Sequence, residues 1–113
     1  MKPVEIVSQD NISFHITNPV DCLLIAEFAH FNTAIPIPYD SNSVRLFLTF
    51  RSIFNKRTHK LESRFNQLTN TQQQSLIDIS NFLGHAKLTE YITHLYYTTI
   101  YYTQLIPKFF TDM

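Results

Sequence analysis

The spacing of apolar residues changes along this sequence, and that change limits the folds open to it. Val4 to Val7 holds β-branched residues, and Ile12 to Ile16 alternates strictly between apolar and polar side chains. Because successive side chains of a strand point to opposite faces of a sheet, these segments and the polar turn between them predict a β-hairpin. Residues 35–39 contain two prolines, which donate no ladder hydrogen bonds, so we expect a short edge strand or an extended connector there.

Helical spacing dominates the rest of the chain. Asn18 before Pro19 predicts the start of a helix that runs to about Ala29. A second helix is capped by Ser41 or Ser43, and its apolar residues form one stripe: Leu46, Phe47, Phe50, Ile53 and Phe54. The segment from Lys56 to Leu68 is polar and aperiodic, so we expect a loop there.

Cap signals bound two further helices. The cluster Thr69–Thr71 predicts the start of the first, and Gly84, the only glycine, predicts the left-handed residue at its end. The second is predicted from about Ala86 to Gln104, before Pro107, since proline does not continue a helix.

This order of elements predicts the α+β class. We expect a small mixed sheet, made of the hairpin and the short edge strand, packed on a cluster of four to five helices. The length of 113 residues fits one domain over 1–113, with a core over 1–104 and a C-terminal tail over 105–113.

Composition excludes several classes of partner. Nine basic and nine acidic residues cancel, which argues against nucleic acid and against an acidic membrane surface. The local exception is a basic run of Lys56, Arg57, Lys60 and Arg64, which we interpret as a solvated loop rather than a phosphate or nuclear-import patch. Ten Phe and six Tyr are more rings than so short a chain can easily bury, so some should lie on the surface as contact material.

The compartment expected is the cytoplasm, the nucleus or both. Cys22 is the only cysteine and cannot form an internal disulfide, which favours a reducing compartment. The first ten residues carry charges and have no apolar run, so we expect no signal peptide.

No set of catalytic, cofactor-binding or metal-binding residues is found, and the chain is predicted not to be an enzyme. A single glycine leaves no material for a phosphate-binding loop. Glu90 and His94 lie four residues apart, but a zinc site needs at least one more ligand. His15 is expected to point outward from its strand.

Two helices carry apolar residues outside their core stripes. Between Gln72 and Leu83, Phe82 lies at the polar margin beside Asp78, so either it contacts a partner or it packs under a neighbouring helix. The last helix has one stripe that fits the core: Leu88, Ile92, Leu95, Thr99 and Tyr102. A second stripe, made of Tyr97, Ile100 and Tyr101, predicts a partner because so small a domain does not easily cover both.

Several segments resemble one family. Residues 4–14 look like the opening hairpin of S-phase-kinase-associated protein one and of elongin C, and residues 35–38 and 44–50 continue the likeness. Ser75–Leu83 resembles a helix of that family that ends in Asn, an aromatic residue and Leu, and His85–Tyr97 resembles the next helix. The resemblance implies the BTB/POZ fold and no cofactor.

The function that this resemblance implies is that of an adaptor in a cullin-RING E3 ubiquitin ligase. Such an adaptor bridges a cullin and a substrate receptor of the F-box or SOCS-box type. By position, Asn81 and Phe82 match the pair at which the family contacts its cullin, and the stripe of Tyr97, Ile100 and Tyr101 matches the start of the receptor surface. No counterpart of the two further helices that hold an F-box follows, so we expect an elongin-C-like use or a divergent adaptor, such as a parasite or viral one. The alternative is a self-associating BTB/POZ module, a homodimer without a role in ubiquitin ligation.

Overall fold

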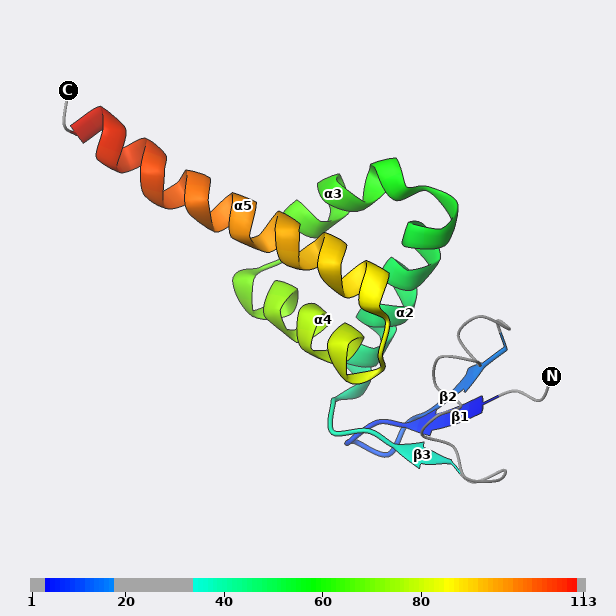
Figure 1. Ribbon diagram of the computed structural model, residues 1–113. Helices are drawn as coiled ribbons and strands as arrows, with labels where there is room; N and C mark the ends of the chain where they lie inside the picture. Colours follow the sequence, from blue (N-terminus) through cyan, green and yellow to red (C-terminus); the bar gives the residue numbers. More distant parts are fainter. Residues whose placement is uncertain (1–3, 18–33, 112–113) are drawn as a thin grey trace.

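The alternating N-terminal segments form strands and the helically spaced segments form helices in the computed structural model, which describes residues 4–17 and 34–111, with side chains as far as residue 98 (Figure 1). The strands are β1 (Val4–Val7), β2 (Ser13–Ile16) and β3 (Ile35–Pro36). The helices are α2 (Ser41–Lys56), α3 (Thr58–Asn66), α4 (Asn70–Phe82) and α5 (Ala86–Thr111). The helix predicted over 18–29, which includes Cys22, lies outside the described residues.

The sheet has the strand order β2-β1-β3 and confirms the hairpin and the short edge strand. β1 and β2 are antiparallel, with Ile6 opposite Phe14. Asn11 in the connecting turn has a φ of 64°, a left-handed conformation that asparagine tolerates better than most residues. β3 runs parallel to β1 and is two residues long. The molecule therefore belongs to the α+β class, with a mixed sheet, as predicted.

A carboxylate joins the hairpin turn to the start of α2. Asp10 Oδ1 accepts hydrogen bonds from the hydroxyl of Ser8 at 2.6 Å and from the backbone N–H of Ser41 at 2.9 Å. Asp10 Oδ2 accepts a third bond from the hydroxyl of Ser41 at 2.5 Å. These bonds favour the ionised carboxylate, those from the Ser41 and Ser8 hydroxyls most strongly, and they lower the pKa of Asp10 to about 2.

Asp10→Asn is expected to weaken the fold and to remove part of its acid sensitivity. The pKa of Asp10 is about 2 in the folded chain, below the ordinary value of 3.8, so its contribution to stability is present above about pH 4 and is lost as the pH falls toward 2. The melting temperature of the wild type should therefore fall more between pH 5 and pH 2 than that of Asp10→Asn, as followed by circular dichroism. Glu62→Gln, at an exposed carboxyl on α3, should keep the wild-type pH profile. Identical profiles for Asp10→Asn and the wild type would contradict the assignment.

The cap of α2 differs from the prediction. Asp40, not Ser41 or Ser43, is the N-cap, and its carboxylate accepts a hydrogen bond from the Ser43 backbone N–H at 2.7 Å. Ser41 is the first residue of the helix, and its hydroxyl donates to Asp10. The predicted stripe is confirmed: Phe47 and Phe50 are buried, and Leu46, Ile53 and Phe54 pack beside them.

The predicted loop from Lys56 to Leu68 was wrong, because most of it is helix α3. Leu61 and Phe65 are both completely buried, and they lie one turn apart on the same face of α3. Two apolar residues are too few to reveal a helical period in the sequence. Arg57, with φ −146° and ψ 62°, interrupts the helical backbone between α2 and α3.

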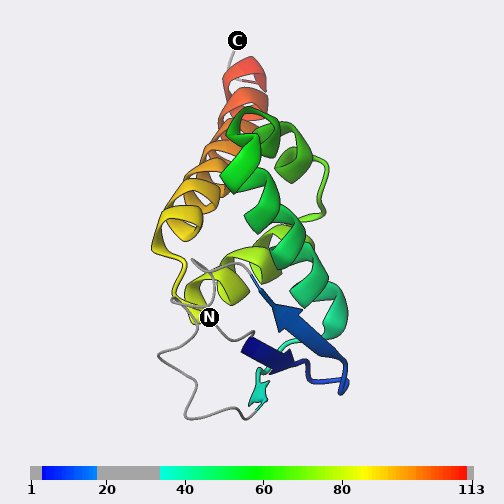
Figure 2. The same ribbon diagram turned by 90° about the vertical axis from the view of Figure 1, so that its right-hand side faces the viewer.

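The last helix is longer than predicted. α5 begins at Ala86, as expected, but continues through Pro107 to Thr111. Proline removes one backbone hydrogen bond from a helix interior, which costs about 3 kcal/mol, and this does not prevent the neighbouring turns from staying helical. In both views α5 extends well beyond the other elements, whereas the sheet lies at the opposite end of the molecule (Figures 1 and 2).

One hydrophobic core joins all these layers. The sheet contributes Ile6 and Ile16, and the helices contribute residues such as Phe50, Leu76 and Ile92. No helix among the described residues combines the length and the apolar character that crossing a membrane requires.

Candidate protein-interaction surface

The C-terminal end of α4 presents Asn81 and Phe82 to solvent. The helix starts at a capping box, in which the Thr69 hydroxyl accepts from the Gln72 N–H at 3.1 Å and the Gln72 side chain accepts from the Thr69 N–H at 2.9 Å. Its predicted inner face is confirmed, since the following residues are buried: Leu76, Ile79, Ser80 and Leu83. Asn81 is therefore turned outward, and Phe82 remains 38% exposed.

A tight turn fixes the position of Phe82 relative to α5. Gly84 has a φ of 77°, and its N–H donates to the Asn81 carbonyl at 3.1 Å. The His85 N–H donates to the Ser80 carbonyl at 3.0 Å, which completes the two-bond pattern that ends many helices at glycine. His85 then caps α5, because its Nδ1 accepts from the Leu88 N–H at 3.2 Å. The predicted role of Gly84 is confirmed.

Two side-chain hydroxyls reinforce this turn. The hydroxyls of Ser80 and Thr89 are 2.7 Å apart and share a hydrogen bond. The Thr89 hydroxyl also lies 2.8 Å from the carbonyl of His85, to which it can donate. Because α4 and α5 are tied together here, the direction in which Asn81 and Phe82 point is set by rigid elements rather than by a loop.

Tyr39 was not predicted as part of this surface. Its ring packs edge to face against Phe82, with ring centroids 5.6 Å apart and an interplanar angle of 69°. Partial burial, together with the negative charge of Asp78, raises the pKa of the Tyr39 hydroxyl. The available signal was its place directly before the N-cap Asp40, where apolar residues often pack on the helix that follows.

A second exposed aromatic lies on α5. Leu88, Ile92 and Leu95 are buried, as the predicted core stripe requires. Tyr97 is 64% exposed, and its ring contacts only the edge of Tyr96 among the aromatic pairs of the described residues, at a centroid distance of 5.6 Å. The side chains of Ile100 and Tyr101, which were predicted to continue this stripe, lie outside the described residues, as do those of Thr99 and Tyr102.

The other candidates from the sequence lie at the surface. Glu90 and His94 are exposed on α5, and His15 is exposed on β2, opposite Glu5. Within the part of the chain that the structure describes, no group of three or more His, Cys, Asp or Glu residues is arranged to hold a metal ion.

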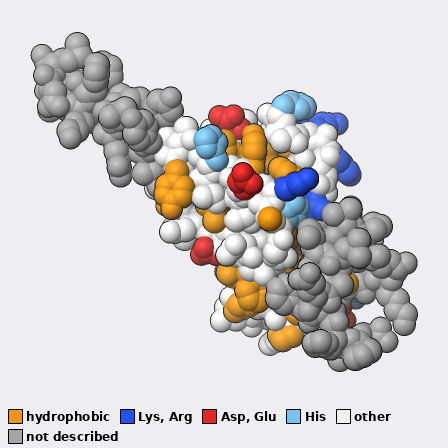
Figure 3. Space-filling view, in the orientation of Figure 1, with side chains coloured by type: hydrophobic (Ala, Val, Ile, Leu, Met, Phe, Trp, Pro, Cys, Tyr) orange, Lys and Arg blue, Asp and Glu red, His pale blue; other side chains and the backbone are white. Residues whose placement is uncertain are grey.

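Exposed apolar side chains lie at separate places on the surface of the described residues. Hydrophobic side chains show at separate places on the face in Figure 3, some beside the distal part of α5 and others lower on the molecule. Large exposed apolar side chains among the described residues are Ile12, Phe82 and Tyr97. An aromatic ring that is anchored on a helix and open to water is well suited to fill a pocket of another protein.

No protein-family model matches the chain, and the search of the curated proteins gives no match.

Proposed function

We propose that the chain is a non-catalytic adaptor with a BTB/POZ-like fold that bridges a cullin and a substrate receptor, in the cytoplasm or nucleus, as a subunit of a cullin-RING E3 ubiquitin ligase. The observation that carries this proposal is the pair of exposed aromatics, Phe82 at the end of α4 and Tyr97 on α5. Tyr97 lies eleven residues after the first residue of α5, which is about 16 Å along the helix axis. A bridging protein needs two such separate faces.

The order of elements supports the proposal. A hairpin, a short edge strand and helices after it are elements that the resemblance implies, although it did not lead us to expect helix α3. Asn81 and Phe82, which match the cullin-contacting pair by position, are exposed on a helix whose opposite face is core. The cullin is proposed to bind there. The receptor, of the F-box or SOCS-box type, is proposed to bind along α5 from Tyr97 onward, where the helix leaves the body of the molecule (Figure 1).

A second candidate is a self-associating module without a role in ubiquitin ligation. It is favoured by the sheet, in which β2 and β3 are the outer strands and pair only with β1 among the described residues. An outer strand can extend its sheet by pairing with a second copy.

The experiment that separates the two is a measurement of solution mass with and without a cullin N-terminal fragment. Sedimentation velocity at low micromolar concentration should give a monomer that forms a one-to-one complex with the cullin fragment. A stable homodimer that binds none of the cullin fragments tested would contradict the adaptor proposal and favour the self-associating module.

Tyr97→Ala is expected to weaken binding of a SOCS-box receptor fragment by about 30-fold or more, the usual effect of removing a dominant aromatic contact. The melting temperature should change little, because the ring is mostly exposed. Isothermal titration calorimetry measures the affinity, and Tyr97→Phe, which keeps the ring, should retain most of it. An unchanged affinity for Tyr97→Ala would remove Tyr97 from the receptor surface.

A further inference from the structure

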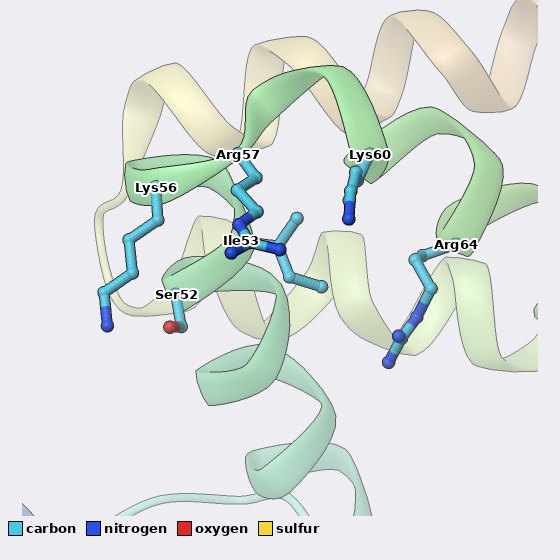
Figure 4. Close-up of a pocket in the computed structure, with 6 residues that line it drawn as sticks. All are labelled: Ser52, Ile53, Lys56, Arg57, Lys60 and Arg64. Carbon is cyan, nitrogen blue, oxygen red and sulfur yellow. The ribbon is translucent and has the colours of Figure 1, made fainter.

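The basic run that the sequence placed in a loop lines a hollow on the protein surface. Its walls are Ser52, Ile53 and Lys56 of α2, the junction residue Arg57, and Lys60 and Arg64 of α3, and its volume is about 350 Å³ (Figure 4). A hollow of this size lies at the lower end of the range for ligand pockets, about 300–1,000 Å³. Four of the six lining residues are cations, and no carboxylate is among them.

The positive charge is local, and no described carboxylate pairs with it. The whole sequence has a formal net charge of zero, so the cluster does not follow from a generally basic composition. Glu62 lies between Lys60 and Arg64 in sequence, but it points about 160° away from Lys60 around the helix axis. Within residues 4–17 and 34–98, no ion pair joins any of the four cations to a carboxylate. In the space-filling view, several Lys and Arg side chains gather on the side of α2 and α3 (Figure 3).

The fold brings these cations together. Lys60 and Arg64 are one turn apart on α3, about 40° from each other around its axis, and Leu61 and Phe65 anchor the neighbouring face in the core. Lys56 ends α2, and Arg57 stands at the break between the two helices. Figure 4 shows the side chains of Lys56, Lys60 and Arg64 extending from the two helices to the same side, with Ile53 and Arg57 between them. No side chain caps the first turn of α3. The partial positive charge at this end of the helix therefore adds to the positive potential of the cations.

We propose that this hollow binds a phosphorylated segment of a partner protein, with phosphoserine or phosphothreonine as the central group. Arginine offers phosphate a planar pair of N–H donors, and lysine adds a mobile charge. Lys60 and Arg64 are about 6 Å apart along α3, close to the spacing of about 6.6 Å between alternate residues of an extended peptide. A phosphate group on one residue and an acidic side chain two residues away can therefore contact one cation each.

The lining favours this ligand over two other anions. Ile53 is half-buried at the middle of the hollow and offers apolar contact, which the methylene groups of a peptide can use and a free inositol polyphosphate cannot. No aromatic residue is among the lining residues, so there is no ring on which a nucleic-acid base could stack.

This site is separate from the proposed cullin face at Phe82. Tyr39, which contacts Phe82, lies just before α2, whereas Lys56 is the last residue of that helix, about 22 Å from its first residue along the axis. Substitutions that remove phosphate binding are therefore expected to leave cullin capture unchanged. Substitutions that abolish cullin capture are likewise expected to leave phosphate binding unchanged.

The test uses the full chain, immobilised, and a peptide library with one fixed phosphoserine between randomised positions. The same library with serine is the reference, and bound peptide is quantified by mass spectrometry. We expect about tenfold greater retention of the phosphorylated library and a decline with rising salt, as charge-assisted contacts require. Equal retention of the two libraries would overturn the proposal.

Matched variants locate the site. Lys60→Glu and Lys87→Glu change the net charge equally at exposed lysines, but only Lys60 lines the hollow. Lys60→Glu should remove the preference for phosphorylated peptides, Arg64→Lys should reduce it, and Lys87→Glu should keep it, with unchanged melting temperatures for all three. An equal loss in Lys87→Glu shows a non-specific charge effect and refutes the site. Binding of inositol hexakisphosphate or of single-stranded DNA through Lys60, without binding of the phosphorylated library, assigns the hollow to that other ligand and also refutes the proposal.

Discussion

Replacing Phe65 by alanine is expected to lower the free energy of unfolding by about 3–5 kcal/mol, the usual range for a large buried aromatic. Phe65 is completely buried, and its ring packs edge to face against Phe50, with centroids 6.4 Å apart and an interplanar angle of 81°. Urea denaturation followed by circular dichroism measures the change.

The effect is large because Phe65 joins three helices. Its ring connects α3 to Phe50 of α2, and its backbone carbonyl accepts a hydrogen bond from the Gln73 side chain of α4 at 2.9 Å. Gln73 is itself buried, so a shift of α3 would also leave its amide without this partner.

Ser63→Ala is the matched control, since Ser63 is exposed on the same helix, and it should change stability by less than about 0.5 kcal/mol. A loss below about 1 kcal/mol for Phe65→Ala would mean that α3 does not pack on the core. In that case the hollow lined by Lys60 and Arg64 would also lose its framework.

The double variant Asn81→Lys with Phe82→Lys is expected to abolish capture of a cullin fragment while the fold persists. Both residues are exposed at the end of α4, so the substitutions replace contact surface rather than core. Two lysines at the centre of an interface would have to lose their water without gaining a partner, which is costly. In the free chain one loss is the ring contact with Tyr39, a contribution of about 0.5–1.5 kcal/mol.

A pull-down with a purified cullin fragment measures the effect, and thermal melting checks the fold. The control variant is Gln74→Lys with Ser63→Lys, which adds the same charge at two other exposed positions. It should capture the cullin like the wild type. If the Asn81→Lys and Phe82→Lys variant still captured the cullin fragment, Asn81 and Phe82 would not be part of the cullin-binding surface.

Local chemistry made some features predictable from the sequence. The alternation of residues 12–16 gave the hairpin, and Gly84 marked the end of α4 because a left-handed residue there has no competitor as favourable as glycine. The Thr69 cap and the apolar face of α4 followed from residues within a few positions of one another. The outward position of Phe82 also followed from helical geometry, although only the structure decided that no neighbouring helix covers it completely.

The tertiary structure decided what depends on residues far apart in the sequence. The contact between Asp10 and Ser41, thirty-one positions apart, ties the hairpin turn to the start of α2. Helix α3 exists because Leu61 and Phe65 find a core built by other helices, which a local period cannot show. Tyr39 joined the surface of Phe82 by the same kind of distant contact. The basic run lines a hollow because it spans the junction of α2 and α3, two helices that meet at Arg57, whereas the sequence predicted a loop there.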